Sequence, residues 1–314
     1  MIYDNYGRPT LNLRISVTQK CDLRCPYCHR EGQASSSTEM SAEEILKITQ
    51  VALALGISRV KLTGGEALLR PDILEIVKGI AKLRGLRDLS MTTNGTLLAS
   101  NVEALRKNGL MRVNVNLPTL NSRVYRELTG GNLKSVLDGI EAAVKSGLYP
   151  VKLNMLVLKG INEMEIPRMI NYAKRSGTIL QIIELEPINV KPTYYSRHHQ
   201  PLNDVEAELE KQALETKTRA YMQNRRIYFL PDAKVEIIRP IENTEFCSRC
   251  TRIRLTSDGK LKPCLMRNDN LVDILTPLRN GADRETLTQI FMEAIKKREP
   301  YYKEVKQLRP LTSS

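Results

Sequence analysis

The six cysteines of this chain form two tight triplets, and their number and spacing suit a metal cofactor. The triplets are Cys21, Cys25 and Cys28, and Cys247, Cys250 and Cys264. Three thiolates leave one coordination position open at each site, whereas a structural zinc site closes its shell with four protein ligands. Because Cys thiolates also hold iron–sulfur clusters, we expect two such clusters, each with one iron free to bind a small molecule.

A zinc knuckle and a chance group of buried thiols are the alternatives for the first triplet. A zinc knuckle needs a fourth ligand, and His29 directly follows Cys28, where neighbouring side chains rarely reach one metal together. Chance is a weak explanation because all six cysteines lie in the two groups. The spacing C-x3-C-x2-C therefore favours an iron–sulfur cluster over zinc.

Composition favours a reducing, intracellular compartment. Hydrophobic residues make up 41% of the 314 residues, enough for a substantial core. The sequence contains no run of about 18 apolar residues that could cross a membrane, and its first ten residues, MIYDNYGRPT, lack the apolar core of a signal peptide. We therefore expect a cytoplasmic protein without a membrane partner, in which thiols stay reduced.

The formal net charge of +13 allows a solvated basic surface, nucleic-acid binding or recognition of a polyanionic substrate. Aromatic residues make up only 5% and Trp is missing, so platforms for base stacking are not evident. Several basic residues lie inside strand-like segments close to the motifs. This placement favours a local anion pocket, so we expect no nucleic-acid partner.

Strand-like and helix-like segments alternate through the first 185 residues. The expected strands are 11–18, 60–63, 89–92, 111–117, 151–158 and 180–185, and the expected helices are 41–55, one from about 71, 97–107, 133–145 and 163–175. Ser41 and Glu44 have the spacing of a capping box. Six such units predict a parallel α/β sheet that curls into a full or partial barrel, with the site at the C-terminal ends of the strands.

Three motifs follow the first three expected strands. The first cysteine triplet follows strand 11–18, GGE at 64–66 follows the second strand, and TTNG at 92–95 ends the third. An ordinary tight turn is the alternative for the glycine pair. Because the three loops would meet at one end of a barrel, we expect them to form one site.

The pattern changes from residue 187 onward. The expected elements are a loop at 187–203, a polar helix at about 204–218, short strands from about 226 and a final helix at 284–298. The pair His198-His199 is more typical of a surface loop than of a metal site. SDGK at 257–260 predicts a hairpin turn that returns Cys264 to the other two thiols. Beside them, Arg252 and Arg254 share one strand face, where they either face solvent or recognise phosphate.

The first triplet, with Tyr27 before its last cysteine and GGE about one strand–helix unit later, resembles the signature of the radical S-adenosylmethionine (SAM) superfamily. The second triplet, C-x2-C-x13-C with T-R-x-R at 251–254, resembles the GTP 3′,8-cyclase family of that superfamily, and the likeness covers nearly the whole chain. The resemblance implies a radical SAM core at 1–225, a partial (βα)6 TIM-like barrel. It also implies a C-terminal region at 226–314 that carries the second cluster and binds substrate.

The same resemblance implies cofactors, substrate and partners. The cofactors are two 4Fe–4S clusters and SAM, and the substrate is GTP. Reductive cleavage of SAM yields a 5′-deoxyadenosyl radical, which takes hydrogen from ribose C3′ of GTP, and the substrate radical then attacks C8 of guanine. This reaction opens molybdenum cofactor biosynthesis. The implied partners are a flavodoxin- or ferredoxin-like electron donor and the cyclic pyranopterin monophosphate synthase, which would receive the product.

Residue roles carry over to the matching positions of this sequence. The implied cluster ligands are the six cysteines. The implied SAM contacts are Tyr27, Gly65, Asn116 and Glu186. The implied GTP contacts are Arg14, Lys61, Thr92, Lys152, Arg252, Ile253 and Arg254. No further catalytic side chain is implied, because the cofactors carry out the difficult bond cleavage.

The sequence departs from the family pattern at several positions. Asn116 replaces a serine, and Glu186 stands where Met is frequent. Gln181 stands where an arginine assists phosphate binding, and Ala67 replaces a proline. The chain ends in Thr-Ser-Ser at 312–314, whereas many relatives end in two glycines that enter the active site. These differences concern phosphate contact and the role of the tail.

Two other functions fit parts of the pattern. A radical SAM enzyme that modifies a peptide or protein would also carry C-terminal cysteines, although usually more than three. The strand that carries Arg252 and Arg254 argues against a peptide substrate. A basic zinc-containing nucleic-acid-binding protein is the alternative that is not an enzyme. Metal analysis separates them, because iron with acid-labile sulfide excludes the zinc protein.

Overall fold

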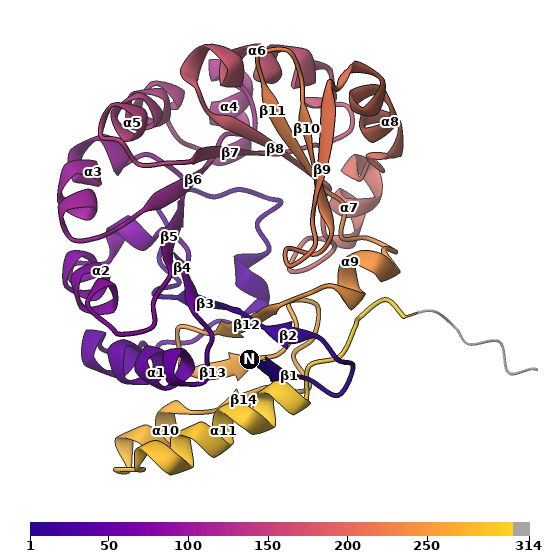
Figure 1. Cartoon of the computed structure of the whole chain (residues 1–314). Helices are drawn as coiled ribbons and strands as arrows, with labels where there is room; N and C mark the ends of the chain where they lie inside the picture. The colour runs from indigo at the N-terminus through magenta and orange to yellow at the C-terminus, as the bar shows by residue number, and fades with distance from the viewer. Residues whose placement is uncertain (304–314) are drawn as a thin grey trace, which may run out of the picture.

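The computed structural model describes residues 1–303, so the chain end at 312–314 lies outside the described residues. Its centre is a 12-stranded sheet that curves into an open barrel (Figure 1). The strand order is β14-β13-β12-β3-β4-β5-β6-β7-β8-β11-β10-β9. A separate two-stranded sheet joins β1 (Ile2–Tyr3) to β2 (Pro9–Thr10).

The six predicted parallel strands are present and neighbour one another in chain order. They are β3 (Asn12–Ser16), β4 (Arg59–Thr63), β5 (Asp88–Thr93), β6 (Arg112–Asn116), β7 (Val151–Leu156) and β8 (Ile179–Ile183). Each neighbouring pair from β3 to β8 is parallel. The prediction of a partial α/β barrel is therefore confirmed.

Helices cover the outside of this sheet (Figure 1). They are α1 (Ala42–Ala54), α2 (Ile73–Ala81), α3 (Leu98–Lys107), α4 (Ser122–Thr129), α5 (Leu133–Lys145) and α6 (Ile166–Ser176), with single 3-10 turns at Arg30–Gly32, Ala67–Leu69 and Glu163–Glu165. Ser41 and Glu44 form the predicted capping box of α1. Within residues 1–303, no helix has the length and apolar character needed to cross a membrane.

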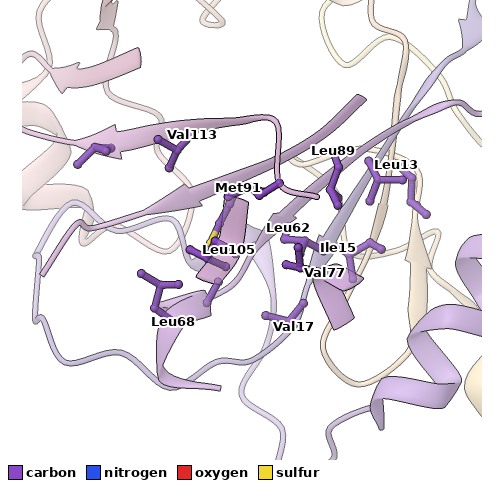
Figure 2. Close-up of a cluster of buried hydrophobic side chains, with 14 of the residues drawn as sticks. Leu13, Ile15, Val17, Leu62, Leu68, Val77, Leu89, Met91, Leu105 and Val113 are labelled. Atoms are coloured by element: carbon purple, nitrogen blue, oxygen red, sulfur yellow. The ribbon is translucent and has the colours of Figure 1, made fainter. Parts of the chain in front are cut away.

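The strands separate apolar from polar side chains because successive residues point to opposite faces of a sheet. Leu13 and Ile15 of β3 and Leu62 of β4 pack against the helices in the hydrophobic core (Figure 2). Arg14, between Leu13 and Ile15, and Lys61, directly before Leu62, face the barrel interior instead. The barrel therefore has an apolar outer face that stabilises it and a polar inner face that can bind a ligand.

The C-terminal segments extend the barrel sheet at both edges. Their elements are α7 (Pro192–His198), α8 (Asn203–Gln212), β9 (Glu215–Arg219), β10 (Arg225–Phe229), β11 (Lys234–Ile238), α9 (Thr244–Ser248), β12 (Arg252–Leu255), β13 (Lys260–Lys262), β14 (Val272–Asp273), α10 (Leu275–Arg279) and α11 (Arg284–Lys296). β11 pairs in parallel with β8, and β12 pairs in parallel with β3. The predicted hairpin at 257–260 is confirmed, since β12 and β13 are antiparallel.

Three local predictions were wrong or incomplete. The expected loop at 187–203 contains helix α7, which begins at Pro192 and places Tyr194 and Tyr195 against a small buried cluster. The expected helix at 204–218 ends at Gln212, because residues 215–219 pair with β10 as strand β9. Helix α4, with Asn121 as its N-cap, was not expected.

Candidate active site inside the barrel

One cavity inside the barrel brings the two cysteine triplets together. All six cysteines line it, and all six are free thiols. The remaining lining comes mainly from the inner faces of the barrel strands and from the loops at their C-terminal ends. The first triplet therefore lies at the C-terminal ends of the strands, as predicted, whereas Cys250 lies just before β12, at the end of the sheet where β3 begins.

The first triplet lies on the loop after β3, and the glycine pair after β4 packs against the backbone of that loop. The N–H of Gly65 donates to the carbonyl of Thr18 at 2.8 Å, and the N–H of Glu66 donates to that of Lys20 at 2.7 Å. A Cβ atom on Gly64 would lie 2.5 Å from the Thr18 carbonyl oxygen, and one on Gly65 would overlap the Lys20 carbonyl oxygen. Both positions require glycine because the two loops approach so closely.

We expect Gly65→Ala to displace the first cysteine loop and to lower the iron bound there at least twofold. The added methyl group cannot fit against the Lys20 carbonyl, and overpacking of this kind typically costs about 1–3 kcal/mol. Iron per chain and SAM cleavage measure the effect. Gly160→Ala is the control for a strained alanine elsewhere in the barrel: its φ of +74° disfavours alanine, but the added Cβ meets no atom within 4 Å, so iron binding should be kept. Normal iron binding and SAM cleavage in Gly65→Ala would contradict this packing.

Glu66 uses its carboxylate to hold the loop after β5. It accepts hydrogen bonds from Thr93 Oγ1 at 2.7 Å and from the Asn94 N–H at 2.6 Å. Burial raises the pKa of Glu66 to about 7 despite these hydrogen bonds. Asn94 Nδ2 in turn donates to Asp22 Oδ1 at 2.7 Å, next to Cys21. The GGE and TTNG motifs thus form one hydrogen-bonded support for the first cysteine loop.

The second triplet is assembled from a short helix and a hairpin. Cys247 lies in α9, Cys250 follows that helix, and the β12–β13 hairpin returns Cys264 to the same cavity. Burial alone would raise the pKa of the Cys250 thiol, but Arg298 and Arg252 outweigh it and lower that pKa. Positive charge therefore favours a thiolate at Cys250, whereas burial raises the pKa of Cys247.

The chemistry of the donor sets fits iron–sulfur clusters. Burial raises the pKa of Cys25 to about 12 and also raises the pKa values of Cys21 and Cys28, so these thiols need a cationic partner to become thiolates. Among residues 1–303, no three His, Cys, Asp or Glu side chains converge closely enough to bind one metal ion directly, and this includes the two triplets. A cluster places its own iron and sulfide between the thiolates, so it suits two open triplets better than a single zinc ion does.

Basic side chains from neighbouring strands line the cavity side by side. The strand registers place Arg254 opposite Arg14, and Arg14 opposite Lys61. Desolvation and nearby cations lower the pKa values of Lys61 and Arg252 well below their ordinary values. Lys61 Nζ donates to Asn114 Oδ1 at 2.7 Å, but among residues 1–303 no carboxylate pairs with Lys61 or Arg252. Desolvated cations without an anion are unfavourable, so the cavity is suited to an anionic ligand.

Glu31 is a site residue that sequence reasoning missed. Its Oε1 lies 3.6 Å from Arg14 Nε and its Oε2 lies 3.7 Å from Arg254 Nε, while Thr63 Oγ1 donates to Oε1 at 3.0 Å. Burial alone would raise the pKa of Glu31, but Arg14, together with His29 and Arg254, outweighs it and lowers that pKa to about 2. In the sequence, Glu31 stands three residues after Cys28, and this closeness to an expected cluster ligand could have identified it as a site residue. Glu31 therefore connects the first cysteine loop to β12, the strand that carries Arg252 and Arg254 beside the second triplet.

Lys152 lies in the cavity wall, but its ammonium group is already paired. Lys152 Nζ lies 2.6 Å from Glu236 Oε2, Gln181 Nε2 donates to the same oxygen at 2.5 Å, and Arg219 Nη1 lies 2.9 Å from Oε1. Desolvation lowers the pKa of Lys152 to about 8 in spite of Glu236. Arg219 and Arg225 also line the cavity, so guanidinium groups are present near Gln181, where the family pattern has an arginine.

The other predicted SAM and GTP residues, with one exception, line the cavity. They are Tyr27, Gly65, Thr92, Asn116 and Glu186. The hydroxyl of Thr92 is buried and, within the described part of the chain, has no hydrogen-bond partner. Ile253 is the exception: its side chain is 0% exposed and packs in the hydrophobic core, because strand alternation turns it away from its arginine neighbours. The roles of these residues toward SAM and GTP stay predictions.

An open α/β barrel with C-x3-C-x2-C after its first barrel strand and GGE after its second is the fold and site of a radical SAM enzyme. Two family models match the chain in agreement with this class. The model of the Radical SAM superfamily matches residues 15–173, and the model of Molybdenum Cofactor Synthesis C matches residues 178–304.

Curated relatives resolve the family further. A protein of Thermococcus kodakarensis named "Probable GTP 3′,8-cyclase" is 51% identical over 311 residues, which cover 96% of this chain and 100% of that protein. A protein of the same name from Methanothermobacter marburgensis is 49% identical, with 96% of this chain and 99% of that protein covered. The chain therefore belongs to the GTP 3′,8-cyclase family of the radical SAM superfamily.

Solved structures with the same fold are more distant in sequence. The crystal structure of Streptococcus suis SuiB bound to precursor peptide SuiA has a TM-score of 0.62 at 19% identity, and the match covers 83% of this chain but only 60% of SuiB. Native anSMEcpe with bound AdoMet has a TM-score of 0.59 at 16% identity, with 92% of this chain and 81% of that chain covered. At these identities the likeness establishes the fold alone.

Proposed function

We propose that this chain converts GTP to (8S)-3′,8-cyclo-7,8-dihydroguanosine 5′-triphosphate, the first step of molybdenum cofactor biosynthesis. The observation that carries the proposal is that both cysteine triplets and the cations Lys61 and Arg252 face one cavity. A triphosphate would supply the anionic partner that Lys61 and Arg252 do not find among residues 1–303. In the same cavity it would also have access to both triplets. Membership of the GTP 3′,8-cyclase family supports the same substrate.

The two triplets would each hold one 4Fe–4S cluster, and SAM would bind beside the first triplet at Tyr27, Gly65, Asn116 and Glu186. When bound, the first cluster and SAM supply the electron and the 5′-deoxyadenosyl radical. The chain would hold SAM and substrate in one cavity. Its first cysteine loop is fixed by the loops after β4 and β5, so the bound reactants would meet in a preorganised site.

The triphosphate would bind to the basic strand faces. The side chains proposed for this role are Arg14, Lys61, Lys152, Arg252 and Arg254, with Thr92 toward the rest of the nucleotide. Ile253 would act by supporting the strand between the two arginines, since its side chain lies in the core. An arginine presents a planar set of donors that matches phosphate oxygens. Glu31 lies between Arg14 and Arg254 and restricts their orientation. Lys152 is held by Glu236, so it would contribute mainly through its charge.

The proposed reaction needs an electron donor, and its product needs an enzyme that takes it further. A flavodoxin- or ferredoxin-like protein would donate the electron, and the cyclic pyranopterin monophosphate synthase would receive the product. We place the reaction in the cytoplasm. We also assign residues 1–225 to the core that binds SAM and residues 226–314 to the region that binds the second cluster and substrate.

We expect Arg252→Ala to weaken GTP binding by about 1.5–3 kcal/mol, the usual contribution of hydrogen bonds to charged groups. Binding of guanosine, which lacks phosphates, should change far less. Anaerobic titration of the reconstituted protein with both ligands measures the difference. Arg123→Ala is the control for loss of one positive charge away from the cavity, since Arg123 pairs with Glu127 on the exposed face of α4. An equal loss of binding free energy for GTP and guanosine would mean that Arg252 supports the cluster or the fold and does not contact the triphosphate.

A further inference from the structure

The loop that carries Cys247 and Cys250 is held by two buried arginines from opposite ends of the described chain. Arg8 Nη1 donates to the backbone carbonyl of Cys247 at 2.9 Å, and Arg298 Nη2 donates to that of Cys250 at 2.5 Å. Arg8 directly precedes β2, and Arg298 follows α11. The two residues are 5% and 0% exposed. Two elements distant in sequence thus fix the backbone beside two of the three cysteines.

A single buried carboxylate connects the two arginines. Asp4 Oδ2 lies 2.8 Å from Arg8 Nε and 3.4 Å from Arg298 Nη1. The other oxygen, Oδ1, accepts from the backbone N–H groups of Tyr6 and Arg8 at 2.9 and 3.0 Å, which fixes the turn between β1 and β2. Arg298 Nη1 also donates to Thr10 Oγ1 in β2. Asp4, Arg8 and Arg298 therefore form one rigid group, the Asp4 triad.

The charge of the Asp4 triad does not balance within itself. Two guanidinium groups share one carboxylate, and both direct N–H groups at the cysteine loop. Replacing a buried ion pair by apolar residues is often neutral or stabilising, so stability of the fold alone does not explain a buried triad. An occupant of negative charge at the loop, such as thiolates with their iron and sulfide, would balance the excess positive charge.

We propose that the Asp4 triad positions the second cysteine triplet and raises the reduction potential of the cluster held there. The potential of an iron–sulfur cluster depends on nearby charge and hydrogen bonds, and positive charge stabilises the reduced, more negative state. The proposal rests on the proposed function only in that the second triplet must hold a cluster. The identity of the substrate does not enter it.

Arg70 distinguishes this role from a merely structural one. It is 8% exposed, donates to the backbone carbonyls of Val17 and Met40 at 2.6 and 2.7 Å, and pairs with Asp72 at 2.6 Å. It thus resembles Arg298 in burial and contacts, but it joins other segments. Replacing Arg70 should lower the melting temperature without changing the potential of the second cluster.

The test uses full-length chains in which the first triplet is replaced by alanine, so that iron and spectra report the second cluster alone. In this background, Arg298→Met, Arg298→Lys and Arg70→Met are compared by iron and sulfide content, melting temperature and a redox titration followed by electron paramagnetic resonance. We expect Arg298→Met to lower the iron content at least twofold and to shift the potential of the remaining cluster to more negative values. Arg298→Lys, which keeps the charge, should restore most of the potential.

Asp4→Asn tests the same proposal through a shift of the reduction potential in the opposite direction. Removing the carboxylate leaves both positive charges, so the potential should shift to more positive values, opposite to Arg298→Met. Arg8→Met, expected to act like Arg298→Met, replaces that variant if it fails to fold. Unchanged potentials in these variants, or an equal shift in Arg70→Met, would overturn the role of the triad. A background chain without iron at the second triplet would instead contradict the proposed function.

Discussion

Replacement of Cys21, Cys25 and Cys28 together by alanine is expected to abolish SAM cleavage and to leave roughly half of the iron. The open coordination position at the first triplet is the proposed binding site of SAM, and without three thiolates no cluster can assemble there. The second triplet should keep its iron because different elements, α9 and the β12–β13 hairpin, build it. Iron and sulfide analysis and an anaerobic assay for 5′-deoxyadenosine measure both effects.

The fold should survive this triple replacement, which makes the result interpretable. The first cysteine loop is held by backbone contacts to Gly65 and Glu66 and by the hydrogen bond from Asn94 to Asp22, none of which uses a thiol. A melting temperature close to that of the unaltered apoprotein is the control. Normal SAM cleavage in the triple variant would refute the assignment of the first triplet.

Replacement of Cys247, Cys250 and Cys264 by alanine is expected to abolish GTP cyclisation while some SAM cleavage remains. The residues proposed for SAM lie in the first cysteine loop, after β4 and β8, and at the end of β6, whereas this triplet lies beside β12, the strand that carries Arg252 and Arg254. Loss of the second cluster should therefore remove a substrate contact before it affects SAM. The assay compares the amounts of cyclised nucleotide and of 5′-deoxyadenosine formed with a chemical reductant.

Instability is the main complication of this second variant, because a bound cluster also stabilises the segments that supply its ligands. The melting temperature and the iron content of the first site therefore accompany the assay. Cyclisation of GTP at the normal rate would show that the second triplet has no part in the reaction. Loss of SAM cleavage in a chain that is folded and retains iron at the first site would contradict the separation of the two roles.

Much of the fold was predictable from sequence because its signals are local. Ser41 and Glu44 specify the start of α1 through backbone hydrogen bonds three residues apart. The alternation of polar and apolar residues in β3 and β4 identifies buried strands with one functional face. Residues 215–219 were not predicted as a strand, because their conformation depends on pairing with β10. Helix α7 was missed because a segment with Pro and aromatic residues is typical of a loop. Its helical form depends on the packing of Tyr194 and Tyr195 against buried side chains, which the sequence does not show.

The candidate site was predictable in part for the same reason. Arg14 and Lys61 sit at alternate positions of apolar strands, which signals an inward-facing charge. The acidic partners of the cavity's cations were not predictable, because the fold brings them together: Glu31 pairs with Arg14, and Glu236 pairs with Lys152 from 84 positions away. The sequence does indicate that Glu236 has a partner, because an acid within the apolar run of β11 requires a buried cation or hydrogen-bond donor. Ile253 shows the opposite limit: its place in the motif suggested a contact, but its side chain lies in the core.

The most direct test of the central claim, that one cavity holds SAM and GTP for a radical reaction at the ribose, uses GTP deuterated at C3′. The reconstituted protein is incubated anaerobically with this substrate, SAM and a reductant, and 5′-deoxyadenosine is analysed by mass spectrometry. The proposed function predicts that deuterium moves into 5′-deoxyadenosine while a 3′,8-cyclised nucleotide forms. Abundant 5′-deoxyadenosine without deuterium and without cyclised nucleotide would contradict it.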